Sequence, residues 1–117
     1  MIEATTLEQE LQQFTGTEQY YFNSMYKWMN YTDGVKFLAE RAGAYWLLDI
    51  IGTELKQFND DFQIIELEVA NNKAVITSKR DTNEPNLWDR NIEFTDFPEG
   101  TWKFYLIDGV LLLPSEY

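Results

Sequence analysis

The chain of 117 residues contains no cysteine and no histidine. The lack of thiols excludes disulfides, zinc–thiolate centres, iron–sulfur clusters and a cysteine nucleophile. The lack of imidazoles excludes a Ser–His–Asp triad, the usual zinc sites and the commonest general base in enzymes. Acid–base chemistry would therefore depend on carboxylates, lysine or hydroxyl groups, and a metal would be a hard cation held by oxygen atoms. We expect no cofactor and no metal site, and we assign no residue a catalytic role.

Positive charge is also scarce, because 9 Lys and Arg residues stand against 20 Asp and Glu residues and the formal net charge is −11. The basic residues are scattered, and Lys79–Arg80 is their only adjacent pair. This distribution excludes contacts with a nucleic-acid phosphate backbone and a polybasic membrane patch. The acidity fits three roles: solubility, binding of a basic partner, or mimicry of the charge of DNA. The third role would need more acids on one face than Glu66 and Glu68 supply.

Long apolar runs and flexible linkers are missing as well. The longest apolar stretch, 44–51, is interrupted by Asp49 and is too short to cross a bilayer. The first 14 residues are acidic and polar and lack the apolar segment of a signal peptide. We therefore expect a cytoplasmic protein. Its length and its lack of linkers and repeats indicate one domain over residues 1–117, and 44% apolar residues are enough for a hydrophobic core.

The first half of the sequence is expected to be mostly helical. Thr6 followed by Gln9 fits a capping box, which predicts a helix from Leu7 to about residue 13 that is ended by Gly16. The aromatic segment 20–28 fits either a pair of strands or an irregular segment.

Two further helices are predicted between residues 32 and 57. Thr32 or Asp33 can cap the first of them, and Gly43 ends it. The second runs from about 44 to 57. Apolar residues recur at helical spacing in both. They are Val35, Leu38, Ala39 and Ala42 in the first and Leu47, Leu48, Ile51, Leu55 and Phe58 in the second.

The second half contains two hairpin signals. Asn71–Asn72 tolerates positive φ between apolar segments at 63–70 and 73–79, and Asp108–Gly109 is a strong type I′ signal. The second hairpin is apolar on both faces, so we expect it to be central, or covered by a helix on one side and a partner on the other. A further strand is predicted near 91–95. The sequence thus predicts an α+β fold with N-terminal helices packed on a four- to five-stranded antiparallel meander sheet.

Several strings resemble the hallmark segments of a known family. They are Phe14–Glu18 (FTGTE), Tyr31–Val35 (YTDGV), Leu38–Glu40 (LAE), Ala42–Asp49 (AGAYWLLD), Thr95–Pro98 (TDFP) and Gly109–Tyr117 (GVLLLPSEY). The resemblance is to an uncharacterised bacterial family of small single-domain proteins of unknown function. It implies a shared fold and a bacterial origin, and it supplies no activity, cofactor or catalytic residue.

Asp49 is the first candidate site residue, because a carboxylate is unexpected inside an apolar stretch. On a helical wheel it lies opposite the apolar stripe with Tyr45 and Trp46 near it. A carboxylate bordered by aromatic rings can have a raised pKa and act as an acid, a base or a ligand. The alternative is that Asp49 lies on a partly solvated face, or accepts a hydrogen bond from a Tyr or Trp of another segment.

Asp33 and Arg41 are two further candidates. Asp33 lies beside Gly34 at a helix start, where a carboxylate can contact a ligand or simply serve as the N-cap. Arg41 can bind an anion or form an ion pair with a carboxylate of the same chain. For both residues the structural role is the simpler alternative.

Trp88 and Arg90 are residue types that often anchor protein interfaces. With the aromatic residues of the first half they could form an exposed patch, or most of these rings could fill the core. The rings in question are those of Tyr20, Tyr21, Trp28 and Tyr31.

We infer from the sequence a small acidic binding or accessory protein without enzymatic activity. It would act through contact with a protein partner that the sequence does not identify, and a homodimer is one possibility. A second hypothesis is a small ligand-binding protein or enzyme that uses carboxylates around Asp49. The third is a mimic of DNA charge.

Overall fold

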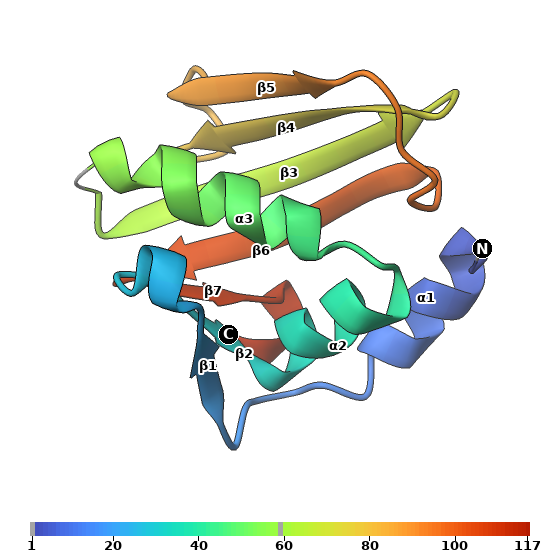
Figure 1. Ribbon diagram of the computed structural model, residues 1–117, viewed down its shortest axis with the longest axis horizontal. Coiled ribbons are helices and arrows are strands. Elements are labelled where there is room, and N and C mark those ends of the chain that lie inside the picture. The colour runs from blue at the N-terminus through green and yellow to red at the C-terminus, as the bar shows by residue number, and fades with distance from the viewer. Residues whose placement is uncertain (1, 59) are drawn as a thin grey trace.

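The computed structural model describes residues 2–58 and 60–117, in which it defines three α-helices, seven β-strands and three short 3₁₀-helices (Figure 1). The α-helices are α1 (Ala4–Leu11), α2 (Asp33–Arg41) and α3 (Tyr45–Glu54). The strands are β1 (Tyr20–Phe22), β2 (Asn30–Thr32), β3 (Phe62–Ala70), β4 (Lys73–Lys79), β5 (Trp88–Ile92), β6 (Gly100–Ile107) and β7 (Val110–Leu112). The 3₁₀-helices are η1 (Ser24–Tyr26), η2 (Leu55–Gln57) and η3 (Pro114–Glu116).

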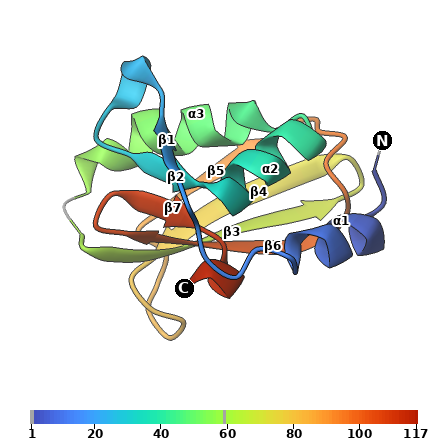
Figure 2. The same cartoon turned by 90° about the horizontal axis from the view of Figure 1, so that it is seen from below.

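The seven strands form one sheet in the order β1-β2-β7-β6-β3-β4-β5. Its pairs are antiparallel except for β2 and β7, which run parallel. The helices α2 and α3 lie on one side of this sheet, which we call the inner face (Figures 1 and 2). On the opposite side, the outer face, η3 and the β4–β5 connection project (Figure 2). The predicted α+β class is therefore confirmed.

Both predicted hairpins are confirmed in turn and register. The turn residues have positive φ, which is 54° and 60° at Asn71 and Asn72 and 48° and 78° at Asp108 and Gly109, as a type I′ turn requires. Their partners include Leu67 with Ile76, Glu66 with Thr77, Leu106 with Leu111 and Tyr105 with Leu112. The hairpin of β6 and β7 is central, as expected from its two apolar faces.

The start and end of α2 agree with the prediction. Thr32 Oγ1 accepts a hydrogen bond from the Val35 amide at 3.3 Å, and Gly43 follows the helix with φ of 62°. The next helix, α3, continues through η2 to residue 57, close to the predicted end.

The first helix differs from the prediction. It begins at Ala4, and its N-cap is Glu3, whose side chain makes no capping hydrogen bond. The capping box at Thr6 is therefore wrong. The burial of Leu7 against the core fixes the helix, and a local cap is not needed for that packing.

The predicted meander of four to five strands is wrong in two respects. The structure has seven strands, since β1 and β2 add to the five predicted; β1 lies in the segment for which a pair of strands was one alternative, whereas β2 lies beyond that segment. The chain order is also interrupted twice, by the pairing of β6 with β3 and by that of β2 with β7. Both strands have three residues, which is too short for an alternation of apolar and polar residues to identify a strand. The pairing of Asn30 with Val110 is a tertiary contact that no local pattern specifies. The strand predicted near 91–95 lies earlier, at β5.

The core lies between the inner face and the helices. It contains Leu67, Ile76 and Phe104 from the sheet and Leu48 and Ile51 from α3, all of them fully buried. Each such side chain contributes about 2 kcal/mol through burial. No helix within residues 2–58 and 60–117 is long and apolar enough to cross a membrane.

Candidate functional site

Asp49 belongs to a contact that we call the tyrosine joint, formed by Tyr26, Asp49 and Gly52. The Tyr26 hydroxyl donates a hydrogen bond of 2.8 Å to Asp49 Oδ1. One turn along α3, Gly52 offers no side chain, and a Cβ there would lie 2.3 Å from the Tyr26 ring. The ring therefore packs directly on the helix backbone. Asp49 is exposed to solvent, and its carboxylate orients a buried tyrosine.

Tyr45 and Trp46 make contacts other than those of Asp49. Tyr45 is 40% exposed, and its hydroxyl is 3.4 Å from Glu40 Oε1, to which it donates a hydrogen bond. Trp46 is half-buried against the core. A different tryptophan reaches the joint, because the Trp28 indole N–H donates to the Gly52 carbonyl at 2.7 Å.

Three tyrosines around α3 resist ionisation. Burial raises the pKa of Tyr26 well above its usual value, and the hydrogen bond to Asp49 raises it further. Burial also raises the pKa of Tyr31, helped by the negative charges of Glu40 and Asp49. The pKa of Tyr45 is raised to about 12, first by burial and then by Glu40. Such a cluster favours neutral phenols that act as hydrogen-bond donors.

The raised pKa values predict a loss of stability in alkali. A phenol whose pKa is higher in the folded state contributes fully below its ordinary pKa of 10.0, and this contribution is lost as the pH rises from there toward about 12. Tyr26→Phe should lower the free energy of unfolding by about 1 kcal/mol at neutral pH. The deficit should shrink above pH 10, because the variant has one phenol fewer to ionise on unfolding.

Urea unfolding of the wild type and Tyr26→Phe, followed across this pH range, tests both statements. Tyr20→Phe is the matched control, because it removes an exposed hydroxyl and should leave stability at neutral pH unchanged. A deficit of Tyr26→Phe that stays constant with pH would contradict the assignment.

Asp33 ties the loop before β1 to the start of α2. Its Oδ2 accepts from the Glu18 amide at 2.9 Å, and its Oδ1 accepts from the Tyr21 hydroxyl at 2.8 Å. The amide of Asp33 in turn donates to Thr17 Oγ1 at 2.9 Å. These hydrogen bonds lower the pKa of Asp33 below its usual value, and the bond from the Glu18 amide has the largest effect. The N-cap itself is Thr32, so Asp33 acts one position inside the helix.

Glu116 is the residue that the sequence did not single out. Its carboxylate accepts from the Thr32 hydroxyl at 2.6 Å, from the Gly34 amide at 3.0 Å and from the Leu113 amide at 3.0 Å. We call the contact of Thr32, Gly34 and Glu116 the C-terminal clasp. A carboxylate at a helix start satisfies free amides and interacts well with the helix dipole. The string PSEY is distinctive, but sequence rules for helix caps consider only residues near the helix start in the chain. Glu116 lies 82 positions after Gly34.

The remaining candidates do not gather in one place. Arg41 Nε donates to Glu10 Oε1 at 2.9 Å, which is the intramolecular alternative. Trp88 is half-buried against the core, and Arg90 pairs with Glu54 of α3. Both lie on β5, whereas Tyr20 lies on β1 at the opposite edge of the sheet. A single aromatic patch that joins them is therefore not formed.

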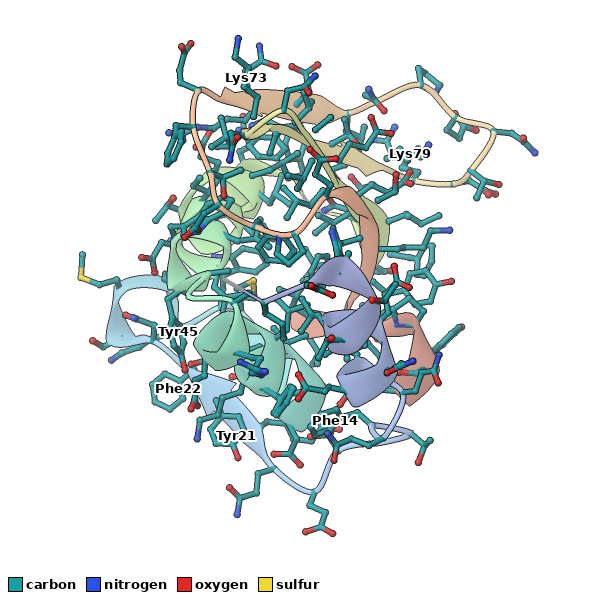
Figure 3. The ribbon with its side chains drawn as sticks, turned by 90° about the vertical axis from the view of Figure 1, so that its right-hand side faces the viewer. Phe14, Tyr21, Phe22, Tyr45, Lys73 and Lys79 are labelled. Atoms are coloured by element: carbon teal, nitrogen blue, oxygen red, sulfur yellow. The ribbon has the colours of Figure 1, made fainter. Side chains whose placement is uncertain are left out.

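Neither Asp49 nor Asp33 lines either of two hollows on the described surface. One, of about 640 Å³, opens at the turn end of β3 and β4 beside Lys73 and Glu93. The other, of about 340 Å³, lies beside Arg41. Figure 3 shows Lys73 and Lys79 toward one end of the molecule and Tyr21 and Phe22 of β1 toward the other. Within residues 2–58 and 60–117, no three carboxylates come together as a metal site.

The outer face carries an apolar surface that neither α2 nor α3 covers (Figure 2). Strand pairing aligns Phe62, Ile107 and Val110 in one row across β3, β6 and β7. It aligns Ile64, Tyr105 and Leu112 in the next row. We call these six side chains the outer belt. Four of them are half-buried, while Ile64 and Leu112 are buried.

Aromatic contacts extend the belt toward the chain end. The Tyr105 ring lies 5.5 Å from that of Phe62 and 5.4 Å from that of Tyr117. Tyr117 itself is 79% exposed. The apolar surface thus continues from the belt to Tyr117, the residue that follows η3.

The structure defines a small α+β protein with helices on one face of a mixed sheet, in which the unusual carboxylates serve as hydrogen-bond acceptors between segments. Comparison with protein families matches residues 5–117 to the family of unknown function DUF6876, and the chain belongs to that family. No similarity to a curated protein or to a solved structure was found. The resemblance noted in the sequence to a family of unknown function is therefore confirmed.

Proposed function

We propose that the chain is a non-enzymatic binding protein whose outer belt contacts a protein partner. The belt is the observation that carries the proposal. A sheet face with aromatic and aliphatic side chains left half-exposed is typical of an interaction surface. The inner face of the same strands already forms the hydrophobic core with the helices.

The charges around the belt favour a basic partner. Asp61 precedes Phe62 in the chain and Asp108 follows Ile107, so both lie beside that row of the belt. The Asp108 amide donates a hydrogen bond to the Asp61 carbonyl at 2.9 Å. Both side chains are exposed, and neither forms a salt bridge within the described residues. Next along β3 from the row of Ile64, the Glu66 carboxylate already forms a salt bridge of 3.2 Å with Lys79. A segment with apolar anchors flanked by Lys or Arg would therefore complement the belt.

The hypothesis of chemistry at Asp49 receives less support. Its carboxylate holds Tyr26, and neither hollow opens beside it. A candidate acid or base needs room for a substrate within hydrogen-bond reach. The geometry therefore favours the binding hypothesis over the enzymatic one.

Selection from a random peptide library tests the proposal without knowledge of the natural partner. Peptides enriched on the wild type should combine aliphatic or aromatic residues with Lys or Arg. Val110→Glu should weaken their binding by roughly tenfold or more, because it places a charge within one of the two apolar rows of the belt. Asp61→Asn with Asp108→Asn should weaken it less and reduce its dependence on salt.

Thr101→Glu is the matched control, since Thr101 is an exposed residue of the outer face of β6 outside the belt. It should bind the selected peptides as the wild type does. Peptides without basic residues, or equal binding to Val110→Glu, would contradict the proposal.

A further inference from the structure

We propose that the chain pairs with a second copy of itself through the free edge of β1, so that one sheet continues across both copies. The pairing would use an edge of the sheet, whereas the function proposed above uses its outer face. The two proposals therefore stand on different observations and can fail separately.

The edge of β1 is open. The strand is the terminal one of the sheet and pairs only with β2. In Figure 2 it lies nearest the viewer, with no other segment in front of it. In an antiparallel pair, part of the N–H and C=O groups of an edge strand point away from its neighbour. The backbone of Tyr20–Phe22 makes no further backbone hydrogen bond among the described residues outside that pair.

The edge also lacks the features that usually prevent strand addition. Residues 19–23 (QYYFN) carry no charge and no proline, although the chain as a whole has a net charge of −11. Tyr20 is 61% exposed and Phe22 59% exposed. The opposite edge, β5, presents the exposed charges of Asp89 and Arg90 instead. Charged edge strands resist pairing with other chains, and β1 has no such protection apart from its short length.

A two-fold axis at Tyr21 makes the edge complementary to itself. Antiparallel pairing would place Tyr20 opposite Phe22 of the second copy, and Phe22 opposite its Tyr20. These rings share one side of the strand, because side chains alternate. The Tyr21 ring points to the other side, where it lies 5.8 Å from the Tyr31 ring and 4.4 Å from Lys36 Nζ. Two aromatic pairs would thus form without any like charges in contact.

The size of the contact sets the affinity. Three residues bury far less than the roughly 800 Å² per partner of a standard interface, even with the 82% exposed side chain of Met25 nearby in the chain. We therefore infer a reversible dimer with a Kd on the order of 10 μM rather than an obligate one.

Sedimentation velocity over a concentration range around that Kd tests the pairing. The wild type should pass from monomer to dimer as its concentration rises. Tyr20→Glu combined with Phe22→Glu places like charges opposite each other across the axis, and it should raise the Kd roughly 30-fold or more. Tyr20→Lys combined with Phe22→Glu places opposite charges across the same axis and should retain the dimer.

Phe94→Glu is the control, because Phe94 is 73% exposed and lies beyond β5 at the other edge of the sheet. It should dimerise as the wild type does, and circular dichroism should show that all variants are folded. A wild type that stays monomeric, or a Glu–Glu variant that still dimerises, would overturn the proposal. Loss of the dimer in the Lys–Glu variant would overturn the two-fold register. None of these changes alters the outer belt, so peptide binding is measured independently.

Discussion

Gly52→Ala is expected to destabilise the protein by about 3 kcal/mol. In an ordinary helix this substitution stabilises by up to about 1 kcal/mol, because alanine has the higher helix propensity. Here the new Cβ would lie 2.3 to 2.7 Å from three atoms of the Tyr26 ring. The ring would have to leave its place, and the hydrogen bond of Tyr26 to Asp49 would be lost with it.

A double-mutant cycle identifies the cause. In a Tyr26→Ala background the obstructing ring is gone, so Gly52→Ala should be neutral or slightly stabilising. Urea unfolding of the wild type, the two single variants and the double variant measures this change of sign. Gly16→Ala is the matched control, because no atom lies within 4 Å of a Cβ at that position. A destabilisation by Gly52→Ala that persists without the Tyr26 ring would refute the explanation.

Glu116→Ala is the second large effect that we expect, with a loss of about 3 kcal/mol. The carboxylate is the acceptor for three donors, and its removal leaves the Gly34 and Leu113 amides without this partner. Glu116→Gln should lower the free energy of unfolding by about 2 kcal/mol, which is less than for alanine. One acceptor oxygen remains, but the other is replaced by an amide nitrogen that cannot accept from these donors. A loss of this size is a substantial part of the stability of a domain, which is about 5–15 kcal/mol.

Hydrogen exchange gives the local measurement for the clasp. In Glu116→Ala the amides of Gly34 and Val35 should exchange faster than in the wild type, because the first turn of α2 loses its acceptor. Ser115→Ala changes an exposed neighbour and should leave these amides protected. Gly34→Ala should resemble Glu116→Ala, since its Cβ would lie 2.6 Å from Leu113 Cδ1 and 2.7 Å from Glu116 Oε1. Unchanged exchange at Gly34 in Glu116→Ala would show that the clasp does not form in solution.

The features that the sequence predicted correctly are those set by neighbouring residues. Asn71–Asn72 and Asp108–Gly109 determine their turns through backbone preferences, and the turns then fix the pairing of the strands on either side. Thr32 caps α2 through an amide three residues away. Local chemistry is sufficient in each of these cases.

The features that the sequence did not predict depend on residues far apart in the chain. Nothing near Asn30 indicates that β2 pairs with β7, and nothing near Gly34 indicates that Glu116 reaches it. The same holds for Asp49, whose alternatives could be separated only by finding the Tyr26 hydroxyl beside it. The strings YTDGV, AGAYWLLD and GVLLLPSEY thus contain residues that contact distant segments, which explains why they resemble a site in the sequence.

The parallel pairing of β2 with β7 also has a consequence for how the chain reaches its native state. Together with the clasp, which joins Gly34 to a residue 82 positions later, it encloses most of the chain in one loop. Contacts of such long sequence separation slow folding, because their loop-closure entropy is lost before the contacts form. We expect the β3–β4 and β6–β7 hairpins to form early and β1, β2 and the start of α2 to become ordered last. The folding nucleus would then lie in the second half of the chain.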